Sequence, residues 1–410
     1  MRQSMLVILS VTCVFVILAL YQRGGDYFMP YTVDKKLTTD SINGKAFGLY
    51  GDGVHDDTNK LNSLLDSGCT KLYLPAGTYL ISKTIHIPDG VELFGDGEGT
   101  VIKLASSFTL TEYAWRDEGG HRTMYPLIYA HDNTTCRDFK IVGDTTAAQD
   151  ILQVGLLISG DNVNCYNVSS YNINYFPQAW RDWKSQFPSG YHAGYGPNTN
   201  CPGFGIFIFE ASNVHVYGGK HENCGYQAIG TDHATDVVVD GLYCGDTNAV
   251  GLQIHRACKR IVFANCIVND NEQNHTSNFT LHGSEDEGVC EDLIITNCVL
   301  NGNAAALCFQ SVWGYEKNVI ITGCKMTSAA DGIVIHRSPR SESIPIGSVA
   351  EDFTITDNII YTGQTGNGIV YNGDYGVITG NIVHYGGETS ISASGTHAVI
   401  ANNIVDAVVN

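Results

Sequence analysis

The stretch FTITDNIIYTGQTGNGIVYNG, residues 353–373, is followed almost at once by GVITGNIVHYGGETSISASG, residues 376–395, which has the same pattern. In both, alternating β-branched residues run to a bend at Asp or Gly, and a second short apolar run follows. Such alternation is typical of strands, and Asn, Asp and Gly are the usual residues at the bends between them. Each stretch therefore predicts one structural unit with at least two strands.

This unit recurs along the C-terminal half of the chain. Repeated units about 23 residues long, with occasional insertions, indicate a solenoid, and parallel crossovers are right-handed. The sequence therefore predicts an all-β fold, a right-handed parallel β-helix. In the aligned segments the fifth position, where the strand bends, falls at Gly218, Gly241, Asn265, Asn297, Gly323, Asp357, Gly380 and Asn402.

The sixth position of the repeat predicts ladders inside the solenoid. Stacked coils lie about 4.8 Å apart, so that equivalent side chains contact one another from coil to coil. We expect a stack of thiols followed by a hydrogen-bonded amide ladder, and we interpret both as structural. The residues are Cys266, Cys298 and Cys324, then Asn358, Asn381 and Asn403.

The N-terminal part resembles a known family. AFGLYGDGVHDDTNKLNSLLDSG (46–68) and KLYLPAGTYLISKTIHIPDGVELFGDGEGTVIK (71–103) look like the opening of the pectate-lyase-superfamily β-helix domain. That family includes polysaccharide lyases, glycoside hydrolases, uronan epimerases and phage tailspike depolymerases. The resemblance implies a single β-helix domain over residues 45–410. In it, Asp56 or Asp57 would cap a short helix whose apolar face, with Leu61, Leu64 and Leu65, plugs the N-terminal end of the solenoid.

Composition and the extreme N-terminus bear on location. Residues 5–21, MLVILSVTCVFVILALY, predict a signal anchor or signal peptide within residues 1–22, followed by a linker over 23–44. Either interpretation places the domain outside the cell or in a lumen, where disulfides and glycosylation are allowed. The domain would be membrane-anchored if residues 5–21 stay uncleaved. A net charge of −19 argues against a nucleic-acid partner. Sequons occur at Asn133, Asn167, Asn274 and Asn278.

A second strand in each unit predicts the functional face. Its second and fourth positions form the core (Ile206 and Ile208, Ile229 and Thr231, Leu252 and Ile254, Leu307 and Phe309), so that the fifth position points out of the core. An ordinary polar face would carry Ser, Thr, Lys and Glu, but this one repeats histidine and His-Arg, which indicates a site. The outward column is Phe209, Asp232, His255, His282, Gln310 and His336, and beside it lie Glu210, His233, Arg256 and Arg337.

Two insertions suggest how a ligand is held. Residues 171–203 are rich in aromatic residues, and we expect Trp180 and Trp183 to stack on sugar rings. The acidic segment GSEDEGVCED (283–292) could bind calcium, although a solvated loop is the simpler interpretation. No cofactor is required by any of these patterns.

The residue types in the strip suit proton abstraction next to a uronate carboxylate. His233 or His255 could be the base, Tyr226 or the other histidine the proton donor, and Arg256 the partner of the carboxylate. This set resembles the mannuronan C5-epimerases, in which His233 would match the catalytic histidine and Arg256 the carboxylate-binding arginine. The sequence departs from that pattern because no Pro precedes His233 and Asp232 is directly adjacent to it. The same groups could carry out β-elimination, which shares the carbanion intermediate.

Two other functions remain possible from the sequence. A polysaccharide hydrolase would need two carboxyl groups, and Glu210 and Asp232, one coil apart, could supply them. The Asp-Asp and Gly-His-Gly motifs of polygalacturonases are absent. A non-enzymatic, membrane-tethered glycan-binding solenoid would keep the aromatic segments, but it would not need the histidine-arginine strip.

Overall fold

The coils of the solenoid are well defined over most of the chain. The computed structural model describes residues 41–109, 115–116, 123–143, 152–173, 203–247, 250–270, 277–281, 288–302, 307–311, 315–335 and 349–407. The apolar segment 5–21 lies outside these ranges. Within them, no helix has the length and apolar character that a membrane crossing requires.

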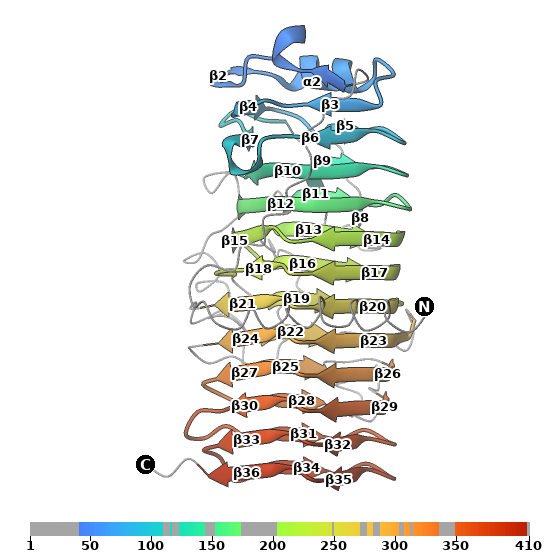
Figure 1. Cartoon of the computed structure of the whole chain (residues 1–410), viewed down its shortest axis with the longest axis vertical. Helices are drawn as coiled ribbons and strands as arrows, with labels where there is room; N and C mark the ends of the chain where they lie inside the picture. The colour runs from blue at the N-terminus through green and yellow to red at the C-terminus, as the bar shows by residue number, and fades with distance from the viewer. Residues whose placement is uncertain are drawn as a thin grey trace, which may run out of the picture. The chain divides into compact units, whose positions relative to one another are not determined.

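From residue 204 onwards, each coil consists of three consecutive strands that stack on their counterparts in the next coil (Figure 1). The strands of successive coils pair in parallel, as the repeat predicts. The coils are β13 (Phe204–Phe209), β14 (Ser212–Tyr217), β15 (Lys220–Cys224); β16 (Gln227–Asp232), β17 (Thr235–Asp240), β18 (Tyr243–Cys244); β19 (Val250–Ile254), β20 (Lys259–Ala264), β21 (Ile267–Asp270); β22 (Ser277–Leu281), β23 (Cys290–Thr296), β24 (Val299–Gly302); β25 (Leu307–Ser311), β26 (Tyr315–Thr322), β27 (Lys325–Ser328); β28 (Ile333–Ile335), β29 (Val349–Thr356), β30 (Ile359–Tyr361); β31 (Ile369–Tyr371), β32 (Val377–Thr379), β33 (Ile382–Tyr385); and β34 (Ile391–Ala393), β35 (Val399–Ala401), β36 (Ile404–Ala407).

The N-terminal coils are less regular. Strand β1 already pairs with β3, so the sheet begins four residues before the predicted domain start. A short antiparallel strand, β8, is added at β9. The elements are β1 (Ser41–Asn43), η1 (Lys45–Phe47), β2 (Asp52–Asp56), α2 (Thr58–Leu65), β3 (Lys71–Tyr73), β4 (Gly77–Ile81), β5 (Ile85–Ile87), β6 (Glu92–Phe94), η2 (Gly97–Gly99), β7 (Thr100–Leu104), β8 (Trp115–Arg116), β9 (Thr123–Ala130), β10 (Thr135–Val142), β11 (Leu152–Ile158) and β12 (Asn164–Ile173).

The bends and ladders follow the repeat. Every residue at the predicted bend has a left-handed backbone, with φ between 53° and 70° at the eight positions, which is why Gly, Asn and Asp recur there. The amide ladder is present as well. The Asn358 Nδ2 donates to Asn381 Oδ1 at 3.0 Å, and Asn381 Nδ2 donates to Asn403 Oδ1 at 2.9 Å. The thiols of Cys266, Cys298 and Cys324 are buried beside it.

Helix α2 lies at the N-terminal end of the stack (Figure 1). Its buried residues include the three leucines expected to face the core, Leu61, Leu64 and Leu65. At its start the Asp56 carboxylate accepts the Thr58 N–H at 2.8 Å, whereas the Asp57 carboxylate accepts the backbone N–H groups of Tyr50 and Gly51 in the preceding loop. Of the two candidates, Asp56 therefore binds the first turn of the helix.

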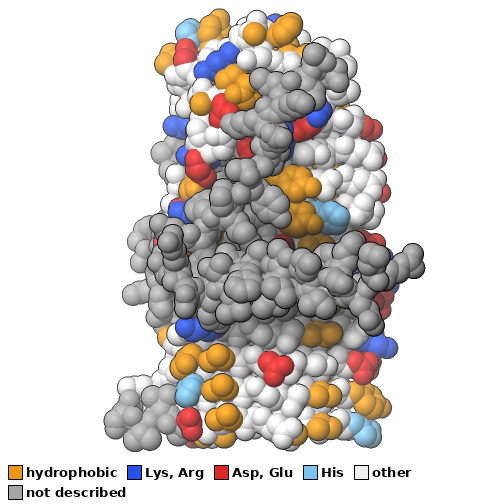
Figure 2. Space-filling model, in the orientation of Figure 1, with side chains coloured by type: hydrophobic (Ala, Val, Ile, Leu, Met, Phe, Trp, Pro, Cys, Tyr) orange, Lys and Arg blue, Asp and Glu red, His pale blue; other side chains and the backbone are white. Residues whose placement is uncertain are grey.

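The C-terminal coil has no further described strand against it. Ile400 and Val405 occupy core columns in which the preceding residues, Ile378 and Val383, are fully buried, yet they are 46% and 44% exposed. Figure 2 shows further hydrophobic side chains on the outer face at this end of the molecule. The burial of each coil thus depends on the next coil in the stack.

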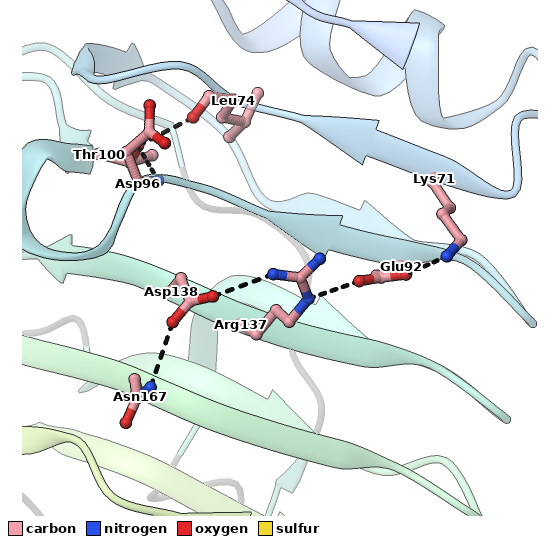
Figure 3. A network of polar contacts seen from close by, with 8 residues as sticks. All are labelled: Lys71, Leu74, Glu92, Asp96, Thr100, Arg137, Asp138 and Asn167. Atoms are coloured by element: carbon pink, nitrogen blue, oxygen red, sulfur yellow. Dashed lines mark hydrogen bonds and ion pairs between the residues drawn. The ribbon is translucent and has the colours of Figure 1, made fainter. Parts of the chain in front are cut away.

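A polar network ties the first coils together on the outside (Figure 3). Glu92 forms ion pairs with Lys71 Nζ at 3.0 Å and with Arg137 Nε at 2.5 Å. Arg137 Nη1 also pairs with Asp138 at 3.0 Å. The second oxygen of Asp138 accepts Asn167 Nδ2 at 3.2 Å. The contacts run from strand to strand along the stack, and their residues are paired with one another, so this network is a structural feature.

A buried histidine lies inside the core. His221 in β15 is fully buried; its Nδ1 lies 2.5 Å from Ser170 Oγ, and burial lowers its pKa to about 3. The folded protein therefore holds this imidazole neutral, whereas the unfolded chain binds a proton near pH 6.5. The stability that depends on the neutral form is complete above pH 6.5 and is lost as the pH falls below that value.

We expect this histidine to make the fold acid-sensitive. Between pH 7 and pH 5 it should remove about 2 kcal/mol from the free energy of unfolding. We expect urea unfolding at both pH values to show this decrease in the free energy of unfolding for the wild type. For His221→Gln the decrease should be smaller by about 2 kcal/mol. His397→Gln, at an exposed histidine, is the control. Equal pH dependence in wild type and His221→Gln would contradict the prediction.

Candidate active site

The strip predicted on the outer face is assembled by β13, β16 and β19, which are stacked neighbours (Figure 1). Ile206, Ile229 and Leu252 are in register and fully buried, as the alternation predicts. Phe209 pairs with Asp232. At the turn, His233 N–H donates to the Arg256 carbonyl at 2.8 Å, which places these two residues on adjacent coils.

Asp232 joins the histidine and the arginine of the strip. Its Oδ1 lies 2.6 Å from His233 Nδ1, and its Oδ2 accepts Arg256 Nη2 at 2.7 Å. The carboxylate is only 3% exposed. Burial by itself would raise the pKa of Asp232, but the hydrogen bond from His233 and the nearby positive charges of His255 and Arg256 outweigh burial and hold the pKa below its usual value. Asp232 is therefore an anion with both oxygens engaged.

His233 lies at the open side of this group. Its side chain is 37% exposed, and its ring meets Phe209 edge-on with centroids 6.3 Å apart. The hydrogen bond to Asp232 raises the pKa of His233 above its usual value, against the opposing effect of burial. In the neutral ring, a proton on Nδ1 donated to Asp232 leaves Nε2 as the basic nitrogen. The arrangement is that of an orienting carboxylate behind a general base.

A second polar cluster lies next to Asp232 and was not predicted. Gly230 leaves room on the outer face, where an added Cβ would come within 2.2 Å of Gln227 Oε1. The Gln227 amide nitrogen donates to Gln253 Oε1 and lies 3.2 Å from His255 Nε2. Gln227 and Gln253 are both buried. The sequence signal that could have predicted this cluster is a glutamine at an outward strand position, opposite a glycine on the neighbouring coil.

Glu210 and Tyr226 have different relations to this group. Glu210 is exposed and donates its backbone N–H to the Asp232 carbonyl at 3.0 Å, so it lies one coil from His233. Tyr226 precedes β16, and the strand rise puts its Cα about 20 Å from that of Asp232. Its ring packs against Phe204, with centroids 5.4 Å apart. The structure brings Glu210 to the site and places Tyr226 at the opposite end of the strand.

The predicted position of Gln310 is wrong by two residues. The alignment placed it beside His282, but β25 pairs Gln310 with Thr280 and Phe309 with Phe279. Leu307 was assigned to the second position of the repeat, and Phe309 holds it instead. A slip of two residues keeps every side chain on the same face of a strand, so hydrophobic alternation alone could not distinguish the two registers.

Several predicted residues lie outside the described ranges: His282, His336, Arg337, Trp180 and Trp183, as well as the side chain of Gln310 and the first half of the acidic segment 283–292. Within the described ranges, no three His, Cys, Asp or Glu side chains form a group that could hold a metal ion. Asp236 has φ of 57° and pairs with Arg260 through both carboxylate oxygens. One sequon, Asn278, is fully buried and therefore cannot carry a glycan in the folded protein.

Comparison with known proteins agrees with this architecture. Residues 41–160 match the family described as rhamnogalacturonase A/epimerase, pectate lyase-like. The resemblance to pectate-lyase-like β-helix proteins is confirmed. The mannuronan C5-epimerase AlgE1 of Azotobacter vinelandii is 43% identical over 75 residues, which are 15% of this chain and 5% of that protein. The pre-neck appendage protein of Bacillus phage phi29 is 32% identical over 88 residues, 21% of this chain and 10% of the phage protein. Each of these matches thus spans a tenth or less of the relative.

Solved structures share the fold along nearly the whole chain. The exopolygalacturonase of Thermotoga maritima superposes with a TM-score of 0.63 at 16% identity, covering 90% of this chain and 92% of the enzyme. The A-module of the Azotobacter vinelandii mannuronan C5-epimerase AlgE4 gives 0.53 at 16% identity, with 88% and 100% covered. The Streptococcus pneumoniae surface adhesin PfbA gives 0.53 at 13% identity, with 89% and 93% covered. An epimerase, a hydrolase and an adhesin thus share this pectate-lyase-like fold.

Proposed function

We propose that the protein acts on a uronate-containing polysaccharide by removing the proton at C5, as a lyase or C5-epimerase. The observation that supports this most strongly is the buried Asp232 carboxylate, which binds His233 through one oxygen and Arg256 through the other. This arrangement fixes a base and a cation on adjacent coils, one step of the solenoid apart. Relatives named mannuronan C5-epimerase and exopolygalacturonase support a uronate polymer as the substrate.

In this mechanism His233 Nε2 takes the C5 proton. Asp232 holds the other ring nitrogen and stabilises the imidazolium that forms. Arg256 neutralises the uronate carboxylate, which makes the C5 proton more acidic and stabilises the carbanion intermediate. His255, the other histidine of the strip, is the group that returns a proton to the opposite face of the ring or protonates the leaving oxygen.

The two-carboxylate hydrolase is less consistent with the geometry. Hydrolysis needs one carboxyl group that is protonated and a second that is free to act as base or nucleophile. Asp232 meets neither requirement, because its pKa is lowered and both of its oxygens are bound. Glu210 would then lack its partner.

Replacement of Arg256 by lysine distinguishes the proposed mechanism from the two-carboxylate hydrolase. We expect Arg256→Lys to reduce kcat/KM on the true substrate by about tenfold to a hundredfold, because a lysine cannot keep the Asp232 contact and also bind a carboxylate bidentately. Arg260→Lys, at an exposed Asp-Arg pair on the same coil, is the matched control. Full activity in Arg256→Lys would show that no carboxylate binds there.

The proposed reaction is best sought with a substrate panel. The chain should be incubated with polymannuronate, polyguluronate, polygalacturonate and a neutral glycan, while the absorbance of unsaturated uronates and the reducing ends are followed. We expect unsaturated products or altered uronate composition with at least one polyuronate and no reaction with the neutral glycan. New saturated reducing ends as the sole product would favour hydrolysis.

A further inference from the structure

The bend between β9 and β10 carries the first of the four sequons, Asn133-Thr134-Thr135. Asn133 is exposed and has a left-handed backbone, with φ of 56°. Asparagine is one of the few residues other than glycine that adopt this conformation readily. The bend alone therefore accounts for an asparagine at this position, but it does not account for the direction of its amide nitrogen.

Asn133 is the first of three stacked asparagines on the outside of the solenoid. The Asn162 Nδ2 donates to Asn133 Oδ1 at 3.1 Å, and Asn213 Nδ2 donates to Asn162 Oδ1 at 2.8 Å. In both hydrogen bonds the nitrogen donates toward the N-terminal end of the stack. The oxygen of Asn133 is thus engaged by the following coil, and its nitrogen is left for the side of the preceding coil.

Gly90 leaves space on that side. It is in register with Asn133, because Glu92 pairs with Thr135 two residues further along both strands. Among the described residues, a Cβ at Gly90 would meet no atom within 4 Å. In the same part of the chain, no acceptor binds Asn133 Nδ2. A bulky substituent therefore fits on this nitrogen while Oδ1 keeps its hydrogen bond to Asn162.

The other sequons lack this combination. Asn167 is half-buried, and its Nδ2 already donates to Asp138 at 3.2 Å in the outer polar network (Figure 3). Asn278 is fully buried. Asn274 lies outside the described residues. Of the three sequons that the structure describes, only Asn133 combines an exposed side chain with an amide nitrogen that has no acceptor there.

We propose that the chain enters a secretory lumen and carries an N-linked glycan on Asn133. The donor is an oligosaccharide linked to a polyprenyl pyrophosphate. Nδ2 forms a bond to the anomeric carbon and loses a proton, while the bond from that carbon to the pyrophosphate breaks. Thr135 supplies the hydroxyl that the acceptor sequence requires. The inference relies on residues 5–21 to bring the chain to the lumen, and it is independent of the proposed reaction.

The test maps glycans on the full chain produced in a eukaryotic secretory host. The folded, protease-resistant protein is treated with peptide N-glycosidase F in oxygen-18 water, which converts each glycosylated asparagine to a labelled aspartate. We expect peptide mass spectra to show the label at Asn133, with unmodified asparagine at Asn167 and Asn278. An unlabelled Asn133 would overturn the proposal, whether the chain stays in the cytosol or reaches the lumen. A label at Asn278 in the folded protein would overturn its structural basis.

Two sequon variants control for deamidation that does not involve a glycan. Thr135→Val removes the hydroxyl of the sequon but keeps Asn133 and the branched shape of the strand residue, so the label at Asn133 should disappear. Ser169→Ala removes the sequon of Asn167 in the same way and is the matched control, in which the label at Asn133 should persist. A label at Asn133 that persists in Thr135→Val would show that no N-linked glycan is attached there, and would overturn the proposal.

Discussion

Replacement of Asp232 by Asn should lower kcat/KM by about a thousandfold, because one carboxylate orients the base and binds the cation. An asparagine has one acceptor and one donor. If its oxygen faces Arg256, its nitrogen donates to His233 Nδ1 and forces the proton of that ring onto Nε2, where the base is needed. If it turns round, the nitrogen faces Arg256 Nη2 and two donors meet. Either orientation disables one half of the site.

The pH profile distinguishes the loss of the Asp232 carboxylate from general damage to the fold. Asp232 raises the pKa of His233, and the base must be neutral, so wild-type activity should rise with pH through an inflection above 6.5. In Asp232→Asn the inflection of the residual activity should move to lower pH. Asp236→Asn, at an exposed aspartate paired with Arg260, is the matched control and should keep full activity.

Loss of the imidazole itself should be nearly as severe. We expect His233→Ala to reduce turnover by about a hundredfold or more while the domain stays folded, as for a lost general base. The residue is at the solvent side of a turn and its side chain is 37% exposed, so the thermal unfolding temperature should change little. Steady-state assays with the polyuronate found active in the panel, together with circular dichroism, measure both effects.

The control for this variant must share its backbone. His233 has a left-handed conformation with φ of 52°, in which an alanine is strained. His397 is also an exposed histidine with a left-handed backbone, at φ of 59°, in the last coil. His397→Ala should therefore show the same small change in stability with full activity. Suppose that His233→Ala and Asp232→Asn remained active while Glu210→Gln was inactive; the two-carboxylate hydrolase would then replace the proposed mechanism.

The repeat made most of the solenoid predictable. Alternation and recurring Asn or Gly fix which residues of a coil are buried and where the chain bends, and these depend on short-range chemistry alone. The same alignment brought Asp232, His233 and Arg256 onto one face. It went wrong at Gln310, because two strand registers that differ by two residues have the same hydrophobic pattern.

The finer organisation of the site was not predictable in the same way. That Asp232 contacts His233 and Arg256 at once depends on side-chain rotamers, which a repeat does not specify. The distance of Tyr226 from the site follows from strand geometry, because Asp232 ends β16 and Tyr226 immediately precedes its first residue.

The central claim, that the site removes a proton from C5 of a uronate, is tested most directly by running the reaction in D₂O and following the polymer by proton NMR. The account predicts that the H5 signal is lost as deuterium enters at C5, or that C5 becomes part of an unsaturated ring, and that neither occurs with His233→Ala. Chain cleavage that retains every H5 proton, with water added across the glycosidic bond, would contradict it.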